Sequence, residues 1–212
     1  MENISIAVLC GGNSSRFRSG SSNSSENGGD KGGKLFYTIK GVPLYKINYR
    51  KLEPFSADIF LQGMEVDDLR SYEDMVKKKG PLGGIYSALQ NAKNETVFVV
   101  AADMPLVQPA ILREFKKYLD YSIVVPKWKS GYVEPLCSLY SKSVLPAAKK
   151  MLNQDVLKVS EMYQRFEDGI TYIDIQSLIK SKKITEDCFI NINTKEDMKK
   201  IDSKYTRSQK SR

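Results

Sequence analysis

Short apolar segments alternate along the chain with longer amphipathic ones, which is typical of βα units on a largely parallel sheet. The apolar segments predict strands at residues 4–9, 57–62, 96–102, 122–126, 170–175 and 188–192. A weaker alternation at residues 134–140 predicts an antiparallel or edge strand. The amphipathic segments predict helices at residues 44–52, 84–92, 109–119, 142–152, 159–166 and 194–201. We therefore expect an α/β fold with one mostly parallel sheet flanked by helices.

The same pattern indicates one domain. No linker divides the chain into halves, and 212 residues suit one substantial domain, which we expect to span residues 1–202. Residues 18–34 hold five Ser and five Gly in seventeen positions. Such a segment buries too little apolar surface to offset the entropy cost of ordering, so a mobile loop is predicted at residues 18–33. Residues 203–212 are predicted to form a basic flexible tail.

Composition and charge narrow the chemistry. The chain has no histidine, which excludes Ser-His-Asp triads, Cys-His dyads and His-ligated zinc. The net charge of +8 could suit nucleic acid, but residues 195–212 hold seven basic and three acidic residues. Half of the excess thus lies in a terminal segment, and a nucleic-acid partner is disfavoured.

Cysteine usage and hydropathy bear on the location of the protein. Three cysteines without metal-ligand spacing do not suggest a disulfide framework. The longest apolar stretch, Val97 to Ala102, is far shorter than the roughly 20 residues needed to cross a bilayer. We expect a cytoplasmic protein with no membrane partner.

The first predicted strand leads into a segment that suits a phosphate group. Leu9 and Cys10 are followed by Gly11, Gly12 and, four residues on, Arg16. Glycines let the backbone approach a ligand closely, and successive N–H groups can form an anion-binding concavity. Arg16 adds a guanidinium fork for phosphate oxygens. These residues match neither G-x-G-x-x-G nor a Walker P-loop, and a plain glycine-rich turn explains them equally well.

Further residues could meet at the same sheet edge. Lys34 could reach a phosphate from the end of a loop, although an ordinary surface lysine is the simpler interpretation. Gly80–Gly84 stands at the start of a predicted helix. Its small residues could contact a flat base, and a plain helix-entry turn is the alternative. Asp103 follows the most apolar strand, where open α/β sheets bind ligands and one carboxylate with substrate phosphates can hold Mg²⁺. A turn or helix cap is the alternative there. Asn193 could bring a side-chain amide to this edge, next to Thr194 as a helix cap.

The order of these segments is more specific than any one of them. The chain carries, in sequence, LCGGNSSR, KLFYTIKGVPL, GPLGGI, AADMPLV, YVEPLCSLY and NINTKEDM. Together they resemble the molybdenum cofactor guanylyltransferase family from about Ile4 to Ile201. The Gly-Gly pair after the first strand and the GPLGG and EPLCSLY segments look more like the guanylyl branch than the molybdopterin cytidylyl branch.

The resemblance implies a single Rossmann-like domain of the nucleotidyltransferase type. It also implies transfer of GMP from GTP to a molybdopterin-type cofactor, with Mg²⁺ and with release of pyrophosphate. By position, Leu9 to Gly11 match the family's nucleotide-binding backbone, with Cys10 where Ala is usual. Gln62 falls near a position that is usually Asn. The expected site comprises Arg16 and Lys34 as catalytic residues; Leu9, Cys10, Gly11, Gly12, Lys34, Gln62, Asp74 and Asp103 as nucleotide-binding residues; and Asp103 and Asn193 as metal ligands.

One departure from the family pattern concerns the lysine. The family normally has Arg-Met-Gly followed closely by Asp-Lys, whereas here Arg16 is followed by an insertion and Gly33-Lys34 replaces the pair. Lys34 keeps the family distance to Gly41, and Lys31, which follows Asp30, is the alternative.

The expected reaction agrees with the lack of histidine, because a phosphate nucleophile is already anionic and requires no general base. Catalysis would then rest on positioning and charge neutralisation. A transferase that uses CTP or another phosphorylated acceptor is the close rival, and a nucleotide- or nucleic-acid-binding module without turnover is the rival from another class. Transient contact with proteins that deliver molybdopterin or mature molybdoenzymes is a further expectation.

Overall fold

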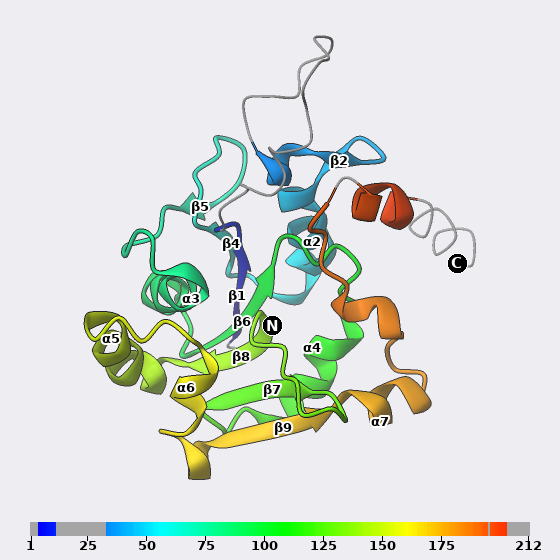
Figure 1. Ribbon diagram of the computed structural model, residues 1–212. Coiled ribbons are helices and arrows are strands. Elements are labelled where there is room, and N and C mark those ends of the chain that lie inside the picture. Colours follow the sequence, from blue (N-terminus) through cyan, green and yellow to red (C-terminus); the bar gives the residue numbers. More distant parts are fainter. Residues whose placement is uncertain (1–3, 12–32, 195, 203–212) are drawn as a thin grey trace.

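A central sheet of seven strands organises this computed structural model, which describes residues 4–11, 33–194 and 196–202 (Figure 1). The strand order is β5-β4-β1-β6-β8-β7-β9. Its strands are β1 (Ile4–Leu9), β4 (Ile59–Gln62), β5 (Ser71–Tyr72), β6 (Thr96–Ala101), β7 (Ile123–Lys127), β8 (Cys137–Ser141) and β9 (Ile170–Asp174). β8 runs antiparallel to β6 and β7, and the other neighbours pair in parallel. The expected α/β fold is confirmed.

Helices cover both faces of the sheet, in agreement with the βα pattern (Figure 1). The α-helices are α2 (Leu44–Leu52), α3 (Gly80–Asn91), α4 (Ala110–Phe115), α5 (Leu145–Asn153), α6 (Ser160–Tyr163) and α7 (Ile175–Lys180). The 3-10 helices are η1 (Lys34–Phe36), η2 (Glu53–Phe55), η3 (Lys116–Tyr118), η4 (Lys142–Val144), η5 (Glu167–Gly169) and η6 (Glu186–Phe189). A small hairpin pairs β2 (Thr38–Ile39) with β3 (Val42–Pro43), and residues 196–202 are helical.

Alternate residues of the buried strands divide the core into two layers, as the period of two requires. Ile6 and Phe98 belong to the layer packed under α2, α4 and α7. Ala7 and Val99 belong to the layer packed under α3, α5 and α6. Because β1 and β6 are buried on both faces, they are nearly continuous apolar runs rather than alternating ones.

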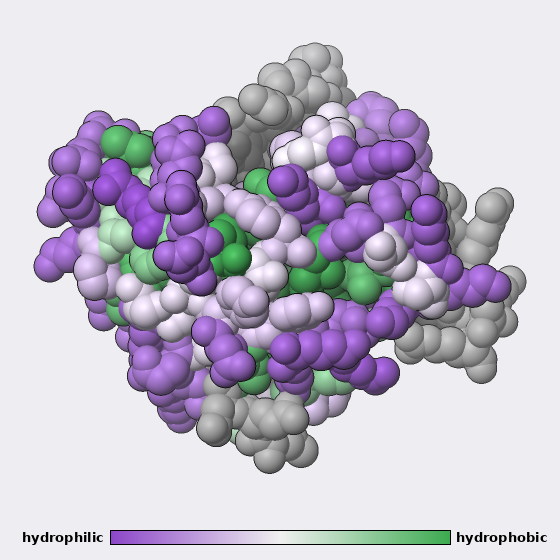
Figure 2. Space-filling model, turned by 90° about the horizontal axis from the view of Figure 1, so that it is seen from below, coloured by the Kyte–Doolittle hydropathy of each residue, from purple (hydrophilic) through white to green (hydrophobic). Residues whose placement is uncertain are grey.

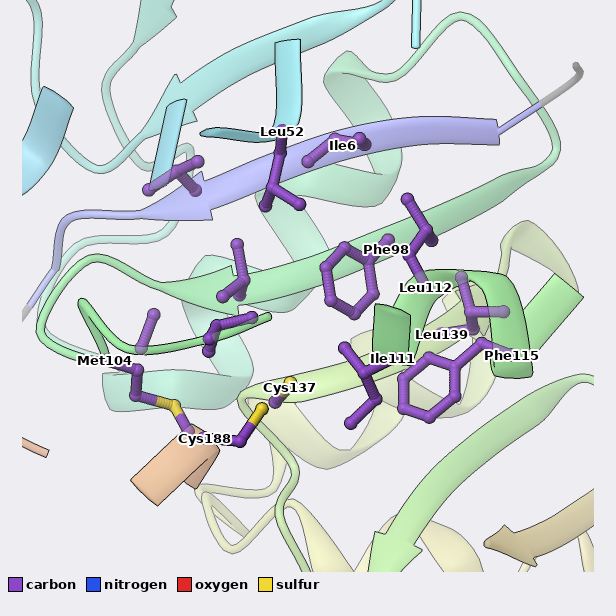
Figure 3. Close-up of a cluster of buried hydrophobic side chains, with 14 of the residues drawn as sticks. Ile6, Leu52, Phe98, Met104, Ile111, Leu112, Phe115, Cys137, Leu139 and Cys188 are labelled. Atoms are coloured by element: carbon purple, nitrogen blue, oxygen red, sulfur yellow. The ribbon is translucent and has the colours of Figure 1, made fainter. Parts of the chain in front are cut away.

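Figure 3 shows the first of these layers. The ring of Phe98 packs edge-on against Phe115 of α4, with centroids 5.7 Å apart. Ile111 and Leu112 of the same helix lie beside them, so the short α4 is held to the sheet by its apolar side. Such a buried cluster is the main source of stability in a domain of this size.

Most of the predicted elements are confirmed, with small shifts of their ends. The helix predicted at 84–92 begins at Gly80, because Pro81 suits a first turn. The helix predicted at 109–119 is an α-helix for residues 110–115 and continues as a 3-10 helix. The helix predicted at 142–152 begins with a 3-10 turn. The helix predicted at 159–166 is reduced to the single turn α6. The segment at 134–140 forms the antiparallel β8, which lies inside the sheet rather than at its edge.

One predicted strand is wrong. Residues 186–189 form the 3-10 helix η6, and residues 190–193 have no regular structure. The apolar side chains of Cys188, Phe189 and Ile192 are buried, but against the core and α2 rather than in a ladder. Burial alone therefore produced the apolar pattern that suggested a strand.

The predicted helix cap at Thr194 is confirmed, whereas other parts of the chain were not predicted or lie outside the described residues. Thr194 does cap the last helix: its N–H donates to Asp197 Oδ2 at 2.9 Å and its Oγ1 accepts from Asp197 N at 3.1 Å. The short strand β5 and helix α7 were not predicted. The predicted mobile loop 18–33, apart from its last residue, and the predicted tail 203–212 lie outside the described residues.

The surface is mixed in character. The face seen in Figure 2 has hydrophobic residues in separate small patches between hydrophilic ones. In the described part of the chain, no helix combines the length and apolar character needed to span a membrane.

Candidate functional site

The parallel strands β1, β4 and β6 end side by side, and we call this end of the sheet the carboxyl edge. Leu9, the last residue of β1, pairs with Gln62 of β4 and with Ala101 of β6. Backbone bonds continue the contact: Cys10 N donates to Gln62 O at 2.7 Å, and Ala102 N donates to Leu9 O at 2.9 Å. Residues that follow these three strands therefore share one site, at the position where open α/β sheets bind ligands.

Lys34 and Asp103 meet at this edge. Lys34 Nζ lies 2.8 Å from Asp103 Oδ2 and donates to the carbonyl oxygen of Ile192 at 2.7 Å. Ile192 N in turn donates to Asp103 O at 2.8 Å. The two charged side chains are 15% and 26% exposed, so they remain reachable by a ligand. The structure thus brings together the predicted Lys34, the predicted Asp103 and the segment that carries Asn193.

A buried polar residue of α2 holds the turn that carries Asp103. Asn48 Nδ2 donates to Ala101 O at 2.9 Å and to Met104 O at 3.0 Å, one carbonyl on each side of Asp103. Lys51, one turn later in α2, donates to two carbonyls further along the same turn at 2.6 and 2.8 Å. Two side chains of α2 therefore hold the backbone around Asp103 in place.

The sequence did carry a signal for Asn48. Leu44, Asn48 and Leu52 are spaced by four residues, so they lie on one face of the helix, and both leucines are fully buried. A polar residue in such an apolar row has to find hydrogen-bond partners inside the protein.

Asp74 lies at the same edge beyond β4, and Gln62 is bonded to it. Gln62 Nε2 donates to Asp74 Oδ1 and to Glu73 O, both at 3.0 Å. Gln62 Oε1 accepts from Asn91 Nδ2 at 2.9 Å. Gln62 is completely buried and Asp74 is half-buried. The predicted pair Gln62 and Asp74 is thus brought together, whereas Asn91 was not singled out from the sequence.

A glycine allows the turns after β1 and β4 to approach each other closely beside Asp74. Gly63 has a φ of +99°, and a Cβ at that position would come within 2.9 Å of Gly11 N and 3.4 Å of Asp74 Oδ2. A Cβ on Gly11 would also lie 3.4 Å from Asp74 Oδ2. The first turn of α3 also packs here, because a Cβ on Gly84 would be in ordinary contact with Leu9 Cδ1 at 3.5 Å. Gly63 was missed by sequence reasoning, because a lone Gly after a strand is a common turn signal.

Two carboxylates flank Cys10 and shape the electrostatics of the site. Burial raises the pKa of the Cys10 thiol well above its ordinary value, and the charges of Asp74 and Asp103 raise it further. A thiol so placed stays protonated, and its Sγ lies 3.6 Å from Val8 O. Burial also raises the pKa of Asp74. Cys10 is therefore a packing residue beside two acids rather than a nucleophile.

The donor set suits a hard cation bound partly by substrate. Within the described ranges, no group of three Asp, Glu or Cys side chains could hold a metal by itself. Asp103 offers one carboxylate, already in contact with the ammonium of Lys34, and the exposed Asn193 follows Ile192 directly. One carboxylate, an amide oxygen and substrate phosphates form the kind of oxygen set that Mg²⁺ accepts.

Three residues named from the sequence have no described position. Gly12, Arg16 and the alternative lysine, Lys31, lie outside the described residues. Their assignment to the site stays a prediction.

Comparisons with known proteins add to this geometry. Residues 6–167 match the family model described as a MobA-like NTP transferase domain. A protein of Thermococcus sibiricus named "probable molybdenum cofactor guanylyltransferase" is 33% identical over 205 residues, which cover 92% of this chain and 95% of that protein. A protein of the same name from Carboxydothermus hydrogenoformans is 30% identical over 206 residues, with 95% and 96% covered.

Solved structures share the fold. Molybdopterin-guanine dinucleotide biosynthesis protein A from Archaeoglobus fulgidus superposes with a TM-score of 0.76 at 23% identity, covering 96% of this chain and 99% of that one. A nucleotidyl transferase from Methanothermobacter thermautotrophicus superposes with a TM-score of 0.69 at 16% identity, covering 98% and 100%. At these identities the superpositions show a common fold of the Rossmann-like nucleotidyltransferase type.

Proposed function

The chain belongs to the MobA-like NTP transferase family, and from that premise we propose that it transfers GMP from GTP to the phosphate of a molybdopterin-type cofactor. The products would be the guanine dinucleotide form of the cofactor and pyrophosphate. Support comes from relatives about 30% identical over nearly the whole chain that carry the name molybdenum cofactor guanylyltransferase. The structural observation that carries the proposal is the convergence of Lys34, Asp103 and Asp74 on one sheet edge. We place this activity in the cytoplasm, in one domain spanning residues 1–202.

Guanine would be recognised by Asp74. The Watson–Crick edge of guanine presents two neighbouring donors, N1–H and the 2-amino group, and an ionised carboxylate is an acceptor with two oxygens. Cytosine has only one donor on the corresponding edge, so it fits the same carboxylate less well. The lack of side chains on Gly11 and Gly63 keeps the backbone clear around Asp74 Oδ2. The site therefore favours a purine with adjacent N–H groups.

The triphosphate would lie at Lys34 and Asp103. Lys34 supplies a positive charge that its bonds to Asp103 and Ile192 hold at the carboxyl edge. Asp103, with Asn193 beside it, would hold Mg²⁺, which when bound neutralises charge on the transferred phosphate. Arg16 and the glycine-rich backbone from Leu9 to Gly12 would complete the contacts to the phosphates.

The chemistry is an in-line displacement. An oxygen of the acceptor phosphate forms a bond to the α-phosphorus of GTP, and the bond from that phosphorus to the bridging oxygen of pyrophosphate breaks. The attacking oxygen is already anionic, so no proton has to be removed. This agrees with a chain that has no histidine and whose Cys10 thiol stays neutral. Transient contact with proteins that supply molybdopterin or receive the product would serve the same reaction.

Pyrophosphate release tests the proposal directly. The full chain is incubated with Mg²⁺, molybdopterin and each of the four ribonucleoside triphosphates in turn. We expect release with GTP, dependent on molybdopterin. Preferential use of CTP would assign the protein to cytidylyl transfer, and no release with any triphosphate would overturn the transferase assignment.

A further inference from the structure

A relay of polar side chains connects the end of α3 with the proposed base-binding carboxylate. Asn91 is the last residue of α3, and its Nδ2 donates to Gln62 Oε1 at 2.9 Å. Gln62 ends β4, and its Nε2 donates to Asp74 Oδ1 at 3.0 Å. Gln62 is fully buried, whereas Asn91 and Asp74 are half-buried. The relay thus runs from the surface, through the core, to the carboxyl edge.

The partners of Gln62 allow only one orientation of its amide. Its Nε2 faces Asp74 Oδ1 and the carbonyl oxygen of Glu73, both of which are acceptors. Its Oε1 must then face a donor, and Asn91 supplies one. With the amide turned over, Oε1 would face two acceptors in a buried place, which is costly. Asp74 and the Glu73 carbonyl therefore set the orientation in which Gln62 donates to Asp74, and Asn91 supports it by satisfying the buried Oε1.

The bond from Gln62 fixes one oxygen of Asp74 and leaves the other beside glycine backbone. Oδ1 accepts from Gln62, whereas Oδ2 lies where a Cβ on Gly11 or Gly63 would be only 3.4 Å away. The hydrogen bond to Oδ1 favours one rotation of the carboxylate about its Cβ–Cγ bond. Two adjacent donors of a flat base can be met together only if that rotation is kept.

We propose that Asn91 is a positioning residue for nucleotide selectivity, which acts on Asp74 through Gln62 and does not itself contact substrate. The inference rests on the proposed use of GTP and on base recognition by Asp74. It adds that selectivity for the 2-amino group of guanine depends on a donor at the end of α3. That group is absent from inosine, so ITP reports on this contact.

Asn91→Asp and Asn91→Leu separate the two consequences of losing that donor. Aspartate has a similar shape but cannot donate to Gln62 Oε1, so Gln62 either faces an acceptor or turns over and opposes Asp74. Leucine removes the donor without adding an acceptor, so the original orientation of Gln62 keeps its bonds to Asp74 and Glu73. The aspartate variant should therefore disturb Asp74 more than the leucine variant does.

The experiment measures binding of GTP and of ITP to the full chain in the presence of Mg²⁺ by titration calorimetry. We expect the wild-type protein to bind GTP more tightly than ITP. Asn91→Asp should reduce that ratio about 5- to 10-fold and Asn91→Leu about 2- to 3-fold, since one hydrogen bond is at stake. The ratio, unlike overall affinity, is insensitive to a general loss of stability.

Gln90→Glu is the matched control. Gln90 is the exposed neighbour of Asn91 on α3, and its side chain reaches Tyr86 Oη at 3.3 Å rather than Gln62. The variant adds the same single negative charge to the same helix end, and its ratio of GTP to ITP affinity should equal that of the wild type. A second readout follows the side-chain amide signals of Gln62 by NMR, which should shift in Asn91→Asp and stay in Gln90→Glu.

The outcomes separate this inference from the function on which it rests. If the wild-type protein prefers GTP but Asn91→Asp keeps the wild-type ratio, the positioning role is wrong and the function stands. If the ratio of GTP to ITP affinity falls equally in Gln90→Glu, the effect is due to the added charge, and the positioning role of Asn91 is also wrong. If the wild-type protein binds ITP or CTP as tightly as GTP, the proposed base site fails, and the inference fails with it. Should Asn91→Asp not fold, the ratio in Asn91→Leu decides.

Discussion

Lys34 and Asp103 are 69 residues apart in the chain, yet their side chains form a half-buried ion pair at the carboxyl edge. An ammonium on Asp103 Oδ2 occupies one of the oxygens that a divalent cation would use. Lys34 and the metal would therefore share the negative charge of Asp103 and of the substrate phosphates. Lys34, the first residue of η1, makes a second hydrogen bond at this edge, to Ile192 O.

Replacing Lys34 tests this residue and the register of the insertion. Lys34→Ala should lower kcat/KM for GTP by about 10²- to 10³-fold, because a charge that stabilises the transition state is lost. Lys31→Ala should change it far less. Steady-state pyrophosphate release with both variants measures the difference. If Lys31→Ala is the more damaging change, the Asp30-Lys31 pair is the functional one, and if neither matters, lysine has no part in the reaction.

At the scale of elements, α2 supports the turn after β6. A nine-residue helix places Asn48 against two carbonyls that flank Asp103, and Lys51 binds two carbonyls further along. The position of Asp103, the proposed metal ligand, is therefore set by a helix that lies well before it in the sequence. Asn48 Oδ1 is buried and has no hydrogen-bond partner among the described residues, so the hydrogen bonds of this side chain to the turn come from its amide nitrogen.

Asn48→Leu should separate this support from ordinary packing. Loss of two buried hydrogen bonds should lower the free energy of unfolding by about 1–3 kcal/mol, measured by urea denaturation. Activity should fall as well, because the turn that carries Asp103 loosens. Arg50→Ala, at an exposed position of the same helix, should stay within about 0.5 kcal/mol of the wild type. Full activity in a folded Asn48→Leu protein would show that the turn keeps Asp103 in place without α2.

At the scale of the whole molecule, the site is assembled from segments spread over most of the sequence. η1, β1, β4, β6 and the segment after η6 each contribute a residue or a backbone group. A ligand that bridges them would tie these segments to one another, and its binding free energy would add to the stability of the fold.

Thermal unfolding with nucleotides should show this coupling. Mg-GTP at about 100 times its dissociation constant should stabilise the protein by about 2.7 kcal/mol, which raises Tm by roughly 5–10 °C for a chain of this size. Mg-CTP at the same concentration, and GTP with the metal chelated, should raise Tm less. A larger shift with Mg-CTP would contradict the proposed preference for guanine.

The sequence by itself determined the elements with strong local signals and the residues placed at their ends. The apolar run Val97–Ala101 predicted a buried strand, and a residue that follows a parallel strand lies at the carboxyl edge. Asp103 and the Leu9–Gly11 segment were found in this way, and the order of the motifs indicated the family that the comparisons then showed.

Only the tertiary structure decided the remaining features, because they depend on contacts between distant segments. The position of β8 inside the sheet, the 3-10 turn at 186–189 and the helix α7 follow from what each segment packs against. The same holds for the partners of the polar side chains: a sequence shows Asn48 and Asn91 as asparagines in helices, but not that one bonds to the turn around Asp103 and the other to Gln62. Hydropathy reports whether a residue is buried, whereas hydrogen bonding requires a particular partner at a particular distance, and the fold alone supplies it.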